Sequence, residues 1–372
     1  MSVAAAASPG KAGGKRPPPA KRRSGIIDGI RKSLFSSPSS TVLTLLCIWA
    51  LVLIIPDLVS WGLLRAVWYS PDAKACGEPG VGACWALVPE KYRLILFGTY
   101  PYDEHWRAAL ASALIIGMTA LSGVRRLWSP ALLVVWIAVM ALALGLLRGG
   151  ILGLTPVDTR EWSGLPLTLI LFVGSVLGGI PLAILLALGR QSNLPAISAL
   201  CTGVIELVRG VPLVSVLFMV SLMLPLFLPD GMTIDKLVRA GLGMTVFFAA
   251  YSAEVVRGGL QAIPRGQYEA ADAMNLGYWT RTRRIVLPQA LRVVLPALVS
   301  DIVRGFKNTT FVSIIGLYDI LGTTRSAIND PVWVRYSIEG YLFIFAIYFV
   351  ACYAMSQYSR HIEKRVSLRR TS

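Results

Sequence analysis

Long apolar segments alternate with shorter polar ones along most of this chain. A helix needs about 20 apolar residues to cross the hydrocarbon of a bilayer. The segments that approach this length are residues 41–64, 108–124, 130–147, 166–188, 196–228, 237–256, 293–317 and 341–355. The fifth is longer than a bilayer requires, so its first part is expected to lie along the membrane interface. The pattern predicts an all-α integral membrane protein with about eight transmembrane helices.

Composition supports this class and changes how the charge is interpreted. Apolar residues make up 55% of the chain and charged residues 15%, and the mean hydropathy is +0.63. The net charge of +16 does not indicate nucleic-acid binding. The excess basic residues lie at the ends of apolar segments and in the tails, where they set orientation and meet anionic lipid.

The orientation follows from these basic clusters. Lys and Arg are enriched in cytoplasmic loops, and eight helices place every large cluster on one side together with both termini. The clusters include Arg22, Arg23, Arg125, Arg126, Arg190, Arg283, Arg284, Arg360 and Lys364. Residues 1–39 are rich in Ala, Gly, Pro and Lys/Arg, which predicts a disordered basic cytoplasmic tail. Residues 361–372 form a second basic tail.

A polar island separates two of the apolar segments. Residues 267–296 read QYEAADAMNLGYWTRTRRIVLPQALRVVLP, and residues 267–274 have a helical pattern with small side chains at Ala270, Ala271 and Ala273. A small face allows close approach to a partner, and Glu269 offers a carboxylate that a partner's Arg or Lys can bind. Pro288 is unfavourable inside a continuous helix and helps to return the chain to the membrane. The plain alternative is a solvated amphipathic linker.

An order of acid, two residues, Arg and Gly occurs three times near the predicted inner ends of core helices. Spacing of three places both charges on one helix face, where they can neutralise each other. Ionisable residues within spans are costly and tend to face the bundle interior or water, so they indicate either a gate along a pathway or structural pairing between helices. The residues are Glu206 and Arg209, Glu254 and Arg257, and Asp301 and Arg304.

The polar run after Asp301 is a further candidate for a pathway lining. Lys307, Asn308, Thr309 and Thr310 bring more polarity into the seventh span than a lipid-facing helix would hold. The amide and hydroxyl groups offer hydrogen-bond donors and acceptors without adding net charge. The alternative is that these groups hydrogen-bond to neighbouring helices.

Residues 65–107 form a long segment predicted to lie outside, and it contains two of the five cysteines. Cys76 and Cys84 lie in the compartment where disulfides persist, with glycines between them that allow a tight loop. The prediction is a disulfide between them, with two free thiols or a metal site as the alternatives. A metal would want more ligands nearby, and the two histidines of the chain, His105 and His361, are predicted to lie on opposite sides of the membrane.

The sequence lacks the motifs of enzymes and energy-converting domains. It has no G-x-x-x-x-G-K-[ST] phosphate loop, no H-E-x-x-H and no plausible Ser/His/Asp set. We therefore expect no catalytic, cofactor or metal residues on this chain. If the protein drives uphill transport, the energy is released on another chain. One alternative is an ion-driven secondary transporter of small polar solutes, which would be expected to show internal repeats. Another is a membrane enzyme or a structural scaffold.

The region from about residue 164 to 360 resembles the membrane-spanning permease subunit of ABC-type importers. The resemblance rests on Glu269-Ala270-Ala271 followed by Ile285, Leu287 and Pro288, the "EAA" loop of that family. Flanking stretches agree at residues 204–213, 251–271, 287–298 and 306–322. Within the family the chain looks like the branch that imports polar and general L-amino acids, and residues before 166 resemble the extension of the general L-amino acid systems.

The resemblance implies an organisation and a set of partners. It implies a five-helix type I permease core at residues 166–360 with its coupling loop at 265–292, preceded by three extra helices within 40–165. It implies a cytoplasmic ATPase dimer that carries ATP and Mg²⁺, a second, different permease subunit and a periplasmic amino-acid-binding protein. The expected location is the inner membrane of a Gram-negative bacterium. In this family the binding protein largely selects the substrate.

One position departs from the family pattern. The glycine that normally follows the motif's Glu by six residues is Asn275 here, and a glycine occurs two residues later as Gly277. That glycine breaks two short helices by entering a left-handed conformation, which Asn tolerates next best. Both Asn275 and Gly277 are therefore candidates for the bend.

Overall fold

The computed structural model describes residues 34–70, 73–124, 127–129, 131–151 and 153–368, with side chains as far as residue 361. Most of the predicted N-terminal tail, Arg125, Arg126 and the side chains of the predicted C-terminal tail lie outside this set. The described residues form helices and no β-strand; the β contacts are isolated bridges between Val67 and Cys84 and between Gly164 and Asp319. The predicted all-α class is confirmed.

Residues 1–65 form a unit of their own, whose principal element is helix α2 (Pro38–Val59). Ser37 caps it by accepting a hydrogen bond from the Ser40 amide, and a proline occupies the first turn, as helix starts favour. The helix continues through residues 60–64 in a wider coil. Its long apolar run has a mean hydropathy of 2.6 over the span window, typical of a helix that crosses a membrane.

Residues 66–372 form the second unit, which begins with the part of the chain predicted as an extension. Its first helices are α3 (Leu87–Phe97), α4 (His105–Ser122) and α5 (Ala131–Arg148). Arg107 of α4 is fully buried and donates to the carbonyls of Leu146 and Thr155 at 2.7 and 3.0 Å. The Leu146 carbonyl is one of the last of α5 and has no partner within its own helix, and Thr155 lies in the segment after α5. Arg107 thus joins α4 to α5, and α4 packs against α6 of the core.

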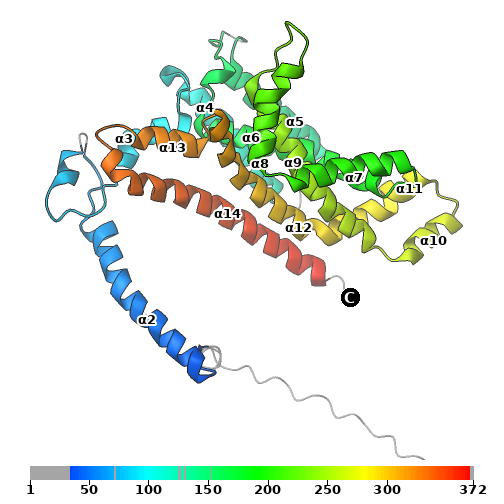
Figure 1. The fold of residues 1–372 in the computed structure, drawn as a ribbon, viewed down its shortest axis with the longest axis horizontal. Helices are drawn as coiled ribbons and strands as arrows, with labels where there is room; N and C mark the ends of the chain where they lie inside the picture. Colours follow the sequence, from blue (N-terminus) through cyan, green and yellow to red (C-terminus); the bar gives the residue numbers. More distant parts are fainter. Residues whose placement is uncertain (1–33, 71–72, 125–126, 130, 152, 369–372) are drawn as a thin grey trace, which may run out of the picture. The chain divides into compact units, whose positions relative to one another are not determined.

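The core of this unit is a bundle of long helices joined by short ones (Figure 1). Helices α6 and α9 pack most extensively, and α9 also contacts α7, α8 and α12. Gly259 permits a close approach of α9 to α12, because a Cβ there would lie 2.8 Å from the Ala290 carbonyl. The helices are α6 (Gly164–Arg190), α7 (Pro195–Gly210), α8 (Leu213–Phe218), α9 (Lys236–Gln261), α10 (Arg265–Ala273), α11 (Tyr278–Arg281), α12 (Leu287–Asn308), α13 (Ile320–Ile328) and α14 (Ser337–Leu368).

Helices occupy all eight predicted ranges, but the count of eight spans is not confirmed. Within the described residues, five helices are long and apolar enough to cross a membrane, or six if one bent pair is a single span. Helices α4 and α9 are not among them. Helix α9 lies between α6, α7 and α12, so its sides meet protein rather than lipid and need not be apolar throughout.

The fifth predicted span is the bent pair. Helices α7 and the stretch Leu213–Phe227 meet at 109°, and the change of direction occurs at Val211 and Pro212, both extended. A proline cannot continue a helix through its own position without losing a hydrogen bond. The first part of the predicted span therefore runs in a different direction from the second, as its excess length indicated.

Cys76 and Cys84 lie together in a disulfide with a Cα–Cα distance of 5.6 Å. The Cys84 amide donates to the buried Glu339 carboxylate of α14 at 2.8 Å. Both cysteines pack in a small apolar cluster with Ile328 and Trp333. The segment before α3 is thus attached to the connection between α13 and α14.

Candidate functional site

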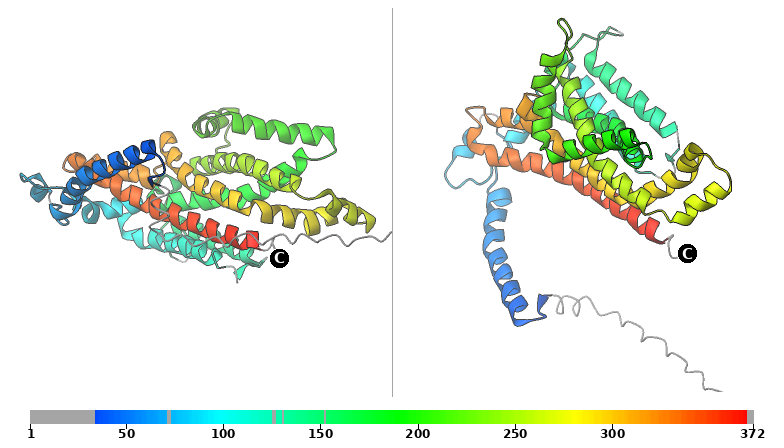
Figure 2. Two further views of the ribbon diagram at one scale, coloured as in Figure 1. Left: turned by 90° about the horizontal axis from the view of Figure 1, so that it is seen from below. Right: turned by 45° about the vertical axis from the view of Figure 1, so that its right-hand side comes forward.

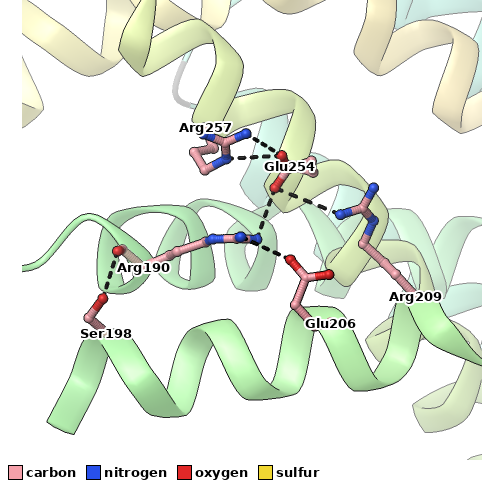
Figure 3. Close-up of polar contacts among 6 residues, drawn as sticks. All are labelled: Arg190, Ser198, Glu206, Arg209, Glu254 and Arg257. Carbon is pink, nitrogen blue, oxygen red and sulfur yellow. Dashed lines mark hydrogen bonds and ion pairs between the residues drawn. The ribbon is translucent and has the colours of Figure 1, made fainter. Parts of the chain in front are cut away.

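The acid–Arg–Gly stretches of α7 and α9 meet around one carboxylate. Glu254 of α9 binds Arg257 one turn further along its own helix and Arg190 at the end of α6, the latter at 3.1 Å. Arg190 also pairs with Glu206 of α7 at 2.9 Å. Figure 3 shows the Arg190 guanidinium between the two carboxylates. The set links the ends of three helices through charge-assisted hydrogen bonds.

The predicted pairing within α7 is wrong. Glu206 and Arg209 form no ion pair with each other; Glu206 binds Arg190, and Arg209 reaches Glu254 at 3.9 Å. Helix α7 ends at Gly210, and its charges are used between helices rather than along its own face. Arg190 entered the sequence analysis only as an orienting residue. Its position at the end of a span, 64 residues from Glu254, gave no local sign of this role.

The third stretch pairs as its spacing predicts. Asp301 of α12 is 4% exposed, binds Arg304 at 2.8 Å and accepts from the Ser252 hydroxyl of α9 at 3.3 Å. A buried carboxylate is costly unless it is paired and hydrogen-bonded. Ser252 was missed by the sequence analysis because a lone serine on an apolar helix carries no distinctive pattern.

A cavity of 580 Å³ joins the second and third stretches to the end of α7. The ring of Tyr251 is close to two guanidinium groups, with Arg209 5.6 Å and Arg304 5.5 Å from its centroid. Such distances are those of cation–π contacts. The polar groups of the cavity are therefore two cations, two carboxylates, an amide and the Tyr251 hydroxyl. The lining residues are Arg209, Leu213, Phe247, Tyr251, Glu254, Val255, Asp301, Arg304, Asn308 and Phe311.

The polar run of the seventh span does not act as one group. Asn308 lines the cavity, whereas Lys307 lines a separate groove. Thr309 is fully buried and donates to the Phe306 carbonyl at 2.8 Å, and Thr310 donates to the Lys307 carbonyl at 2.9 Å. Their hydroxyls bond to the backbone of their own helix turn, which continues as a tighter coil to Ile315. Of the four residues, Asn308 has the position that a pathway lining requires.

The polar island folds as two short helices around a bend at Asn275. Helix α10 ends at Ala273, and Asn275 follows with a positive φ of 54°. The next amide, that of Leu276, returns to the Ala271 carbonyl at 3.1 Å. Gly277 has an extended conformation with φ of −61°. Asn275 thus forms the bend, and the glycine does not.

The loop exposes one face of α10. Glu269, Ala270 and Ala273 are exposed, but Ala271 is fully buried. The expectation that all three alanines share an open face is wrong for Ala271, which lies on the opposite side of the helix and packs inward. Met274 and Trp279, also exposed, add apolar surface to the loop.

Contacts within the loop hold this face in place. Arg281 of α11 binds Asp272 of α10, and its guanidinium lies 5.6 Å from the Tyr268 ring centroid. Burial raises the pKa of the Tyr268 hydroxyl, and the charge of Arg281 acts against that rise.

The loop returns directly into α12. Gln289 of α12 donates to the Gln267 side chain at 3.1 Å. Pro288 stands in the first turn of α12, directly after a wider helical turn at residues 282–286. Its ring and missing amide hydrogen disfavour a regular α-helical turn there, and the half-buried Ile285 and Leu287 precede and begin α12. The loop and the helix that carries Asp301 are therefore one continuous element.

Residues 179–368 match the family described as "Binding-protein-dependent transport system inner membrane component". The chain is 44% identical over 346 residues to the inner membrane amino-acid ABC transporter permease protein YhdY of Escherichia coli K12, covering 92% of this chain and 93% of that protein. It is 35% identical to the glutamate/glutamine/aspartate/asparagine transport system permease protein BztC of Rhodobacter capsulatus, covering 92% and 94%.

A solved structure of an amino acid ABC transporter with histidines is 30% identical to this chain. The match covers 53% of this chain and 90% of the other, with a TM-score of 0.47.

Proposed function

The chain belongs to the family of binding-protein-dependent transport system inner membrane components, and from that membership we propose how its two polar regions work. It is a membrane-spanning permease subunit of an ATP-driven ABC importer, and L-amino acids are the proposed substrate class, as in the names of its relatives. The cavity at Tyr251 forms its half of the translocation path, and the loop of α10 and α11 couples that path to an ATPase.

The single observation that carries this proposal is the charge arrangement of the cavity. An L-amino acid is a zwitterion, and the cavity presents Arg209 and Arg304 near the Tyr251 ring, together with the carboxylates of Glu254 and Asp301. Each carboxylate is already paired with an arginine, so a substrate exchanges ion pairs rather than meeting bare charges. Such a site binds weakly and releases readily, as a transport path requires.

Coupling to ATP hydrolysis is proposed to run through α10. The loop exposes Glu269 and Ala270 on α10 and also the apolar side chains of Met274 and Trp279, a combination of charge and apolar surface that suits a protein interface. ATP and Mg²⁺ belong to the partner ATPase dimer. A push on α10 reaches Asp301 through the Gln267–Gln289 bond and the continuous α12.

The ion network around Glu254 is proposed as the gate at the end of the path nearest this loop. It joins α6, α7 and α9, and relative motion of these helices breaks its bonds. A second, related permease subunit supplies the other half of the path, and a periplasmic amino-acid-binding protein delivers the substrate. The proposed setting is the inner membrane of a Gram-negative bacterium with both termini in the cytoplasm.

Proteoliposomes test the function directly. The chain is reconstituted with its ATPase, second permease subunit and binding protein, and uptake of radiolabelled L-amino acids is measured with ATP inside or outside the vesicle. We expect uptake only when ATP reaches the ATPase and the binding protein is present. Uptake driven by an ion gradient without ATP would instead establish a secondary transporter.

The cavity's role is tested by substrate selectivity. Asn308→Ala is expected to change which amino acids are taken up while basal ATP hydrolysis and assembly persist. Thr310→Ala is the matched control, because Thr310 bonds to its own helix and does not line the cavity. An identical substrate profile for wild type and Asn308→Ala would remove the cavity from the path.

A further inference from the structure

A second polar groove lies between α12 and α14 and shares no lining residue with the cavity at Tyr251. It has a volume of 480 Å³, and its polar lining consists of Ser300, Lys307, Ser356, Ser359 and Arg360. Its remaining walls include Ala297 and Val303. The groove thus joins two cations and three hydroxyl groups, and none of the described side chains that line it is a carboxylate.

Most of these polar groups have no partner within the described residues. Lys307 and Arg360 form no ion pair with any described side chain, and the hydroxyls of Ser356 and Ser359 make no hydrogen bond there. Ser300 alone bonds to its own helix, at the Pro296 carbonyl. Serines within membrane helices usually bond to a carbonyl one turn back, so two hydroxyls and two cations without a partner among the described side chains are available to a ligand.

The geometry of the two helices directs both cations to one place. Helices α12 and α14 run side by side in opposite directions (Figures 1 and 2). Side chains of a helix lean toward its own N-terminus, so Lys307 leans toward the level of Val303 and Arg360 toward that of Ser356. From opposite directions, the two charges approach the middle of the groove.

The face of α14 beyond the groove is suited to lipid chains. Phe345, Phe349 and Tyr353 are exposed and stack in a row, with ring centroids 6.0 and 5.8 Å apart. Steps of four residues keep them on one helix face, and continuing that face leads to Ser356 and Arg360. An apolar strip thus runs directly into a cationic groove near the end of the predicted span.

We propose that this groove binds the phosphodiester headgroup of an anionic phospholipid, whose acyl chains lie along Phe349 and Tyr353. Arg360 and Lys307 bind the phosphate oxygens, and the hydroxyls of Ser356 and Ser359 donate to the remaining acceptors. Basic pockets between membrane helices are suited to anionic headgroups. A bound lipid here connects α14 to α12, the helix that carries Asp301 and Asn308 of the cavity.

Native mass spectrometry of the purified full chain tests the site. Phosphatidylglycerol is added in steps, and the fraction of protein that retains one lipid is measured at each step. The double variant Lys307→Gln/Arg360→Gln is expected to bind phosphatidylglycerol about tenfold more weakly or worse, since each basic residue near the lipid surface contributes severalfold. Arg148→Gln is the matched control: it removes an exposed cation from the end of another apolar helix, α5, where no ion pair holds it among the described side chains.

Equal affinity of wild type and the double variant, or an equal loss in Arg148→Gln, would overturn the proposal. If the double variant does not fold, the single variants Lys307→Gln and Arg360→Gln replace it, each with an expected loss of about threefold. The charge-preserving Lys307→Arg is expected to retain the lipid in either case.

Two further measurements show whether the bound anion is a lipid headgroup or a soluble phosphate, and whether the groove stays open in the assembled transporter. Inorganic phosphate and glycerol 3-phosphate at millimolar concentration are expected not to displace phosphatidylglycerol, because they lack the acyl chains; displacement would mean that the groove takes a soluble anion. The measurement is repeated on the chain assembled with its second permease subunit. Loss of the lipid in that complex would mean that the partner covers the groove. Binding is read without transport, so the outcome does not depend on the proposed import function.

Discussion

The coupling loop and the ion network around Glu254 are both polar, but they are built in different ways. In the loop, Arg281 binds Asp272 nine residues earlier, and a single left-handed residue sets the bend. In the network, Arg190 joins carboxylates from two other helices, one of them 64 residues away. The loop is specified locally and leaves the Glu269 carboxylate exposed. The network has one local pair, Glu254 with Arg257, and its pairs between helices depend on the packed bundle.

This difference predicts where a lost carboxylate destabilises the fold. Glu254→Gln removes the shared partner of Arg190, Arg209 and Arg257 in a partly buried site. Breaking such a set costs about 2–3 kcal/mol, less than a fully buried pair because the site is partly solvated. Thermal unfolding in nanodiscs is expected to show a clear fall in Tm.

Asp272→Asn is the matched change in the loop, where the carboxylate is more than half exposed. Its expected cost is about 0–1 kcal/mol. An equal fall in Tm for the two variants would show that the network contributes no more to stability than a surface ion pair.

Substitution at Asn275, the bend of the loop, is expected to have the next largest effect on stability. Asn275→Ala forces a residue with a Cβ and no side-chain polarity into the left-handed region and is expected to destabilise the loop by about 1 kcal/mol, whereas Asn275→Gly is tolerated. The protection of the Leu276 amide in hydrogen exchange reports the change, since this amide bonds across the bend. Gly277→Ala is the control, because no atom lies within 4 Å of a Cβ there; greater sensitivity at Gly277 would reassign the bend.

The smallest effect distinguishes partners within the network. A double-mutant cycle with Arg190→Gln and Glu206→Gln is expected to give a coupling energy of about 0.5–1 kcal/mol. The same cycle with Arg209→Gln and Glu206→Gln is expected to give about zero, because these side chains are not paired. Coupling in the second cycle alone would restore the pairing that residue spacing predicts.

Sequence periodicity located the helices well and their surroundings less well. Each predicted span lies on a helix, because a helix surface that contacts lipid must be apolar and therefore leaves a long apolar run in the sequence. Helix α9 shows the limit of that record: it is enclosed by other helices, so its sequence is not uniformly apolar. For the bend between α7 and α8, the only indication in the sequence was that residues 196–228 are longer than one membrane span requires.

Residue spacing predicted charge pairs only when both charges use the same helix. It was right for Glu254 with Arg257 and for Asp301 with Arg304, and wrong for Glu206, whose partner lies on α6. Adjacent residues also separate in space: Lys307 and Asn308 line different hollows because consecutive positions on a helix point about 100° apart. Contacts between helices depend on the packed arrangement, which local patterns do not encode.

The central claim is that the loop transmits the action of an ATPase to the bundle through Glu269. The most direct measurement is ATP-dependent amino-acid uptake by proteoliposomes containing the complete importer with Glu269→Lys. Reversing a charge at an interface costs several kcal/mol, so uptake is expected to fall about 100-fold or more while the Tm of the bundle is unchanged. Glu90→Lys, which reverses an exposed charge on α3, is expected to transport normally. Uptake by Glu269→Lys at the wild-type rate would contradict the coupling role.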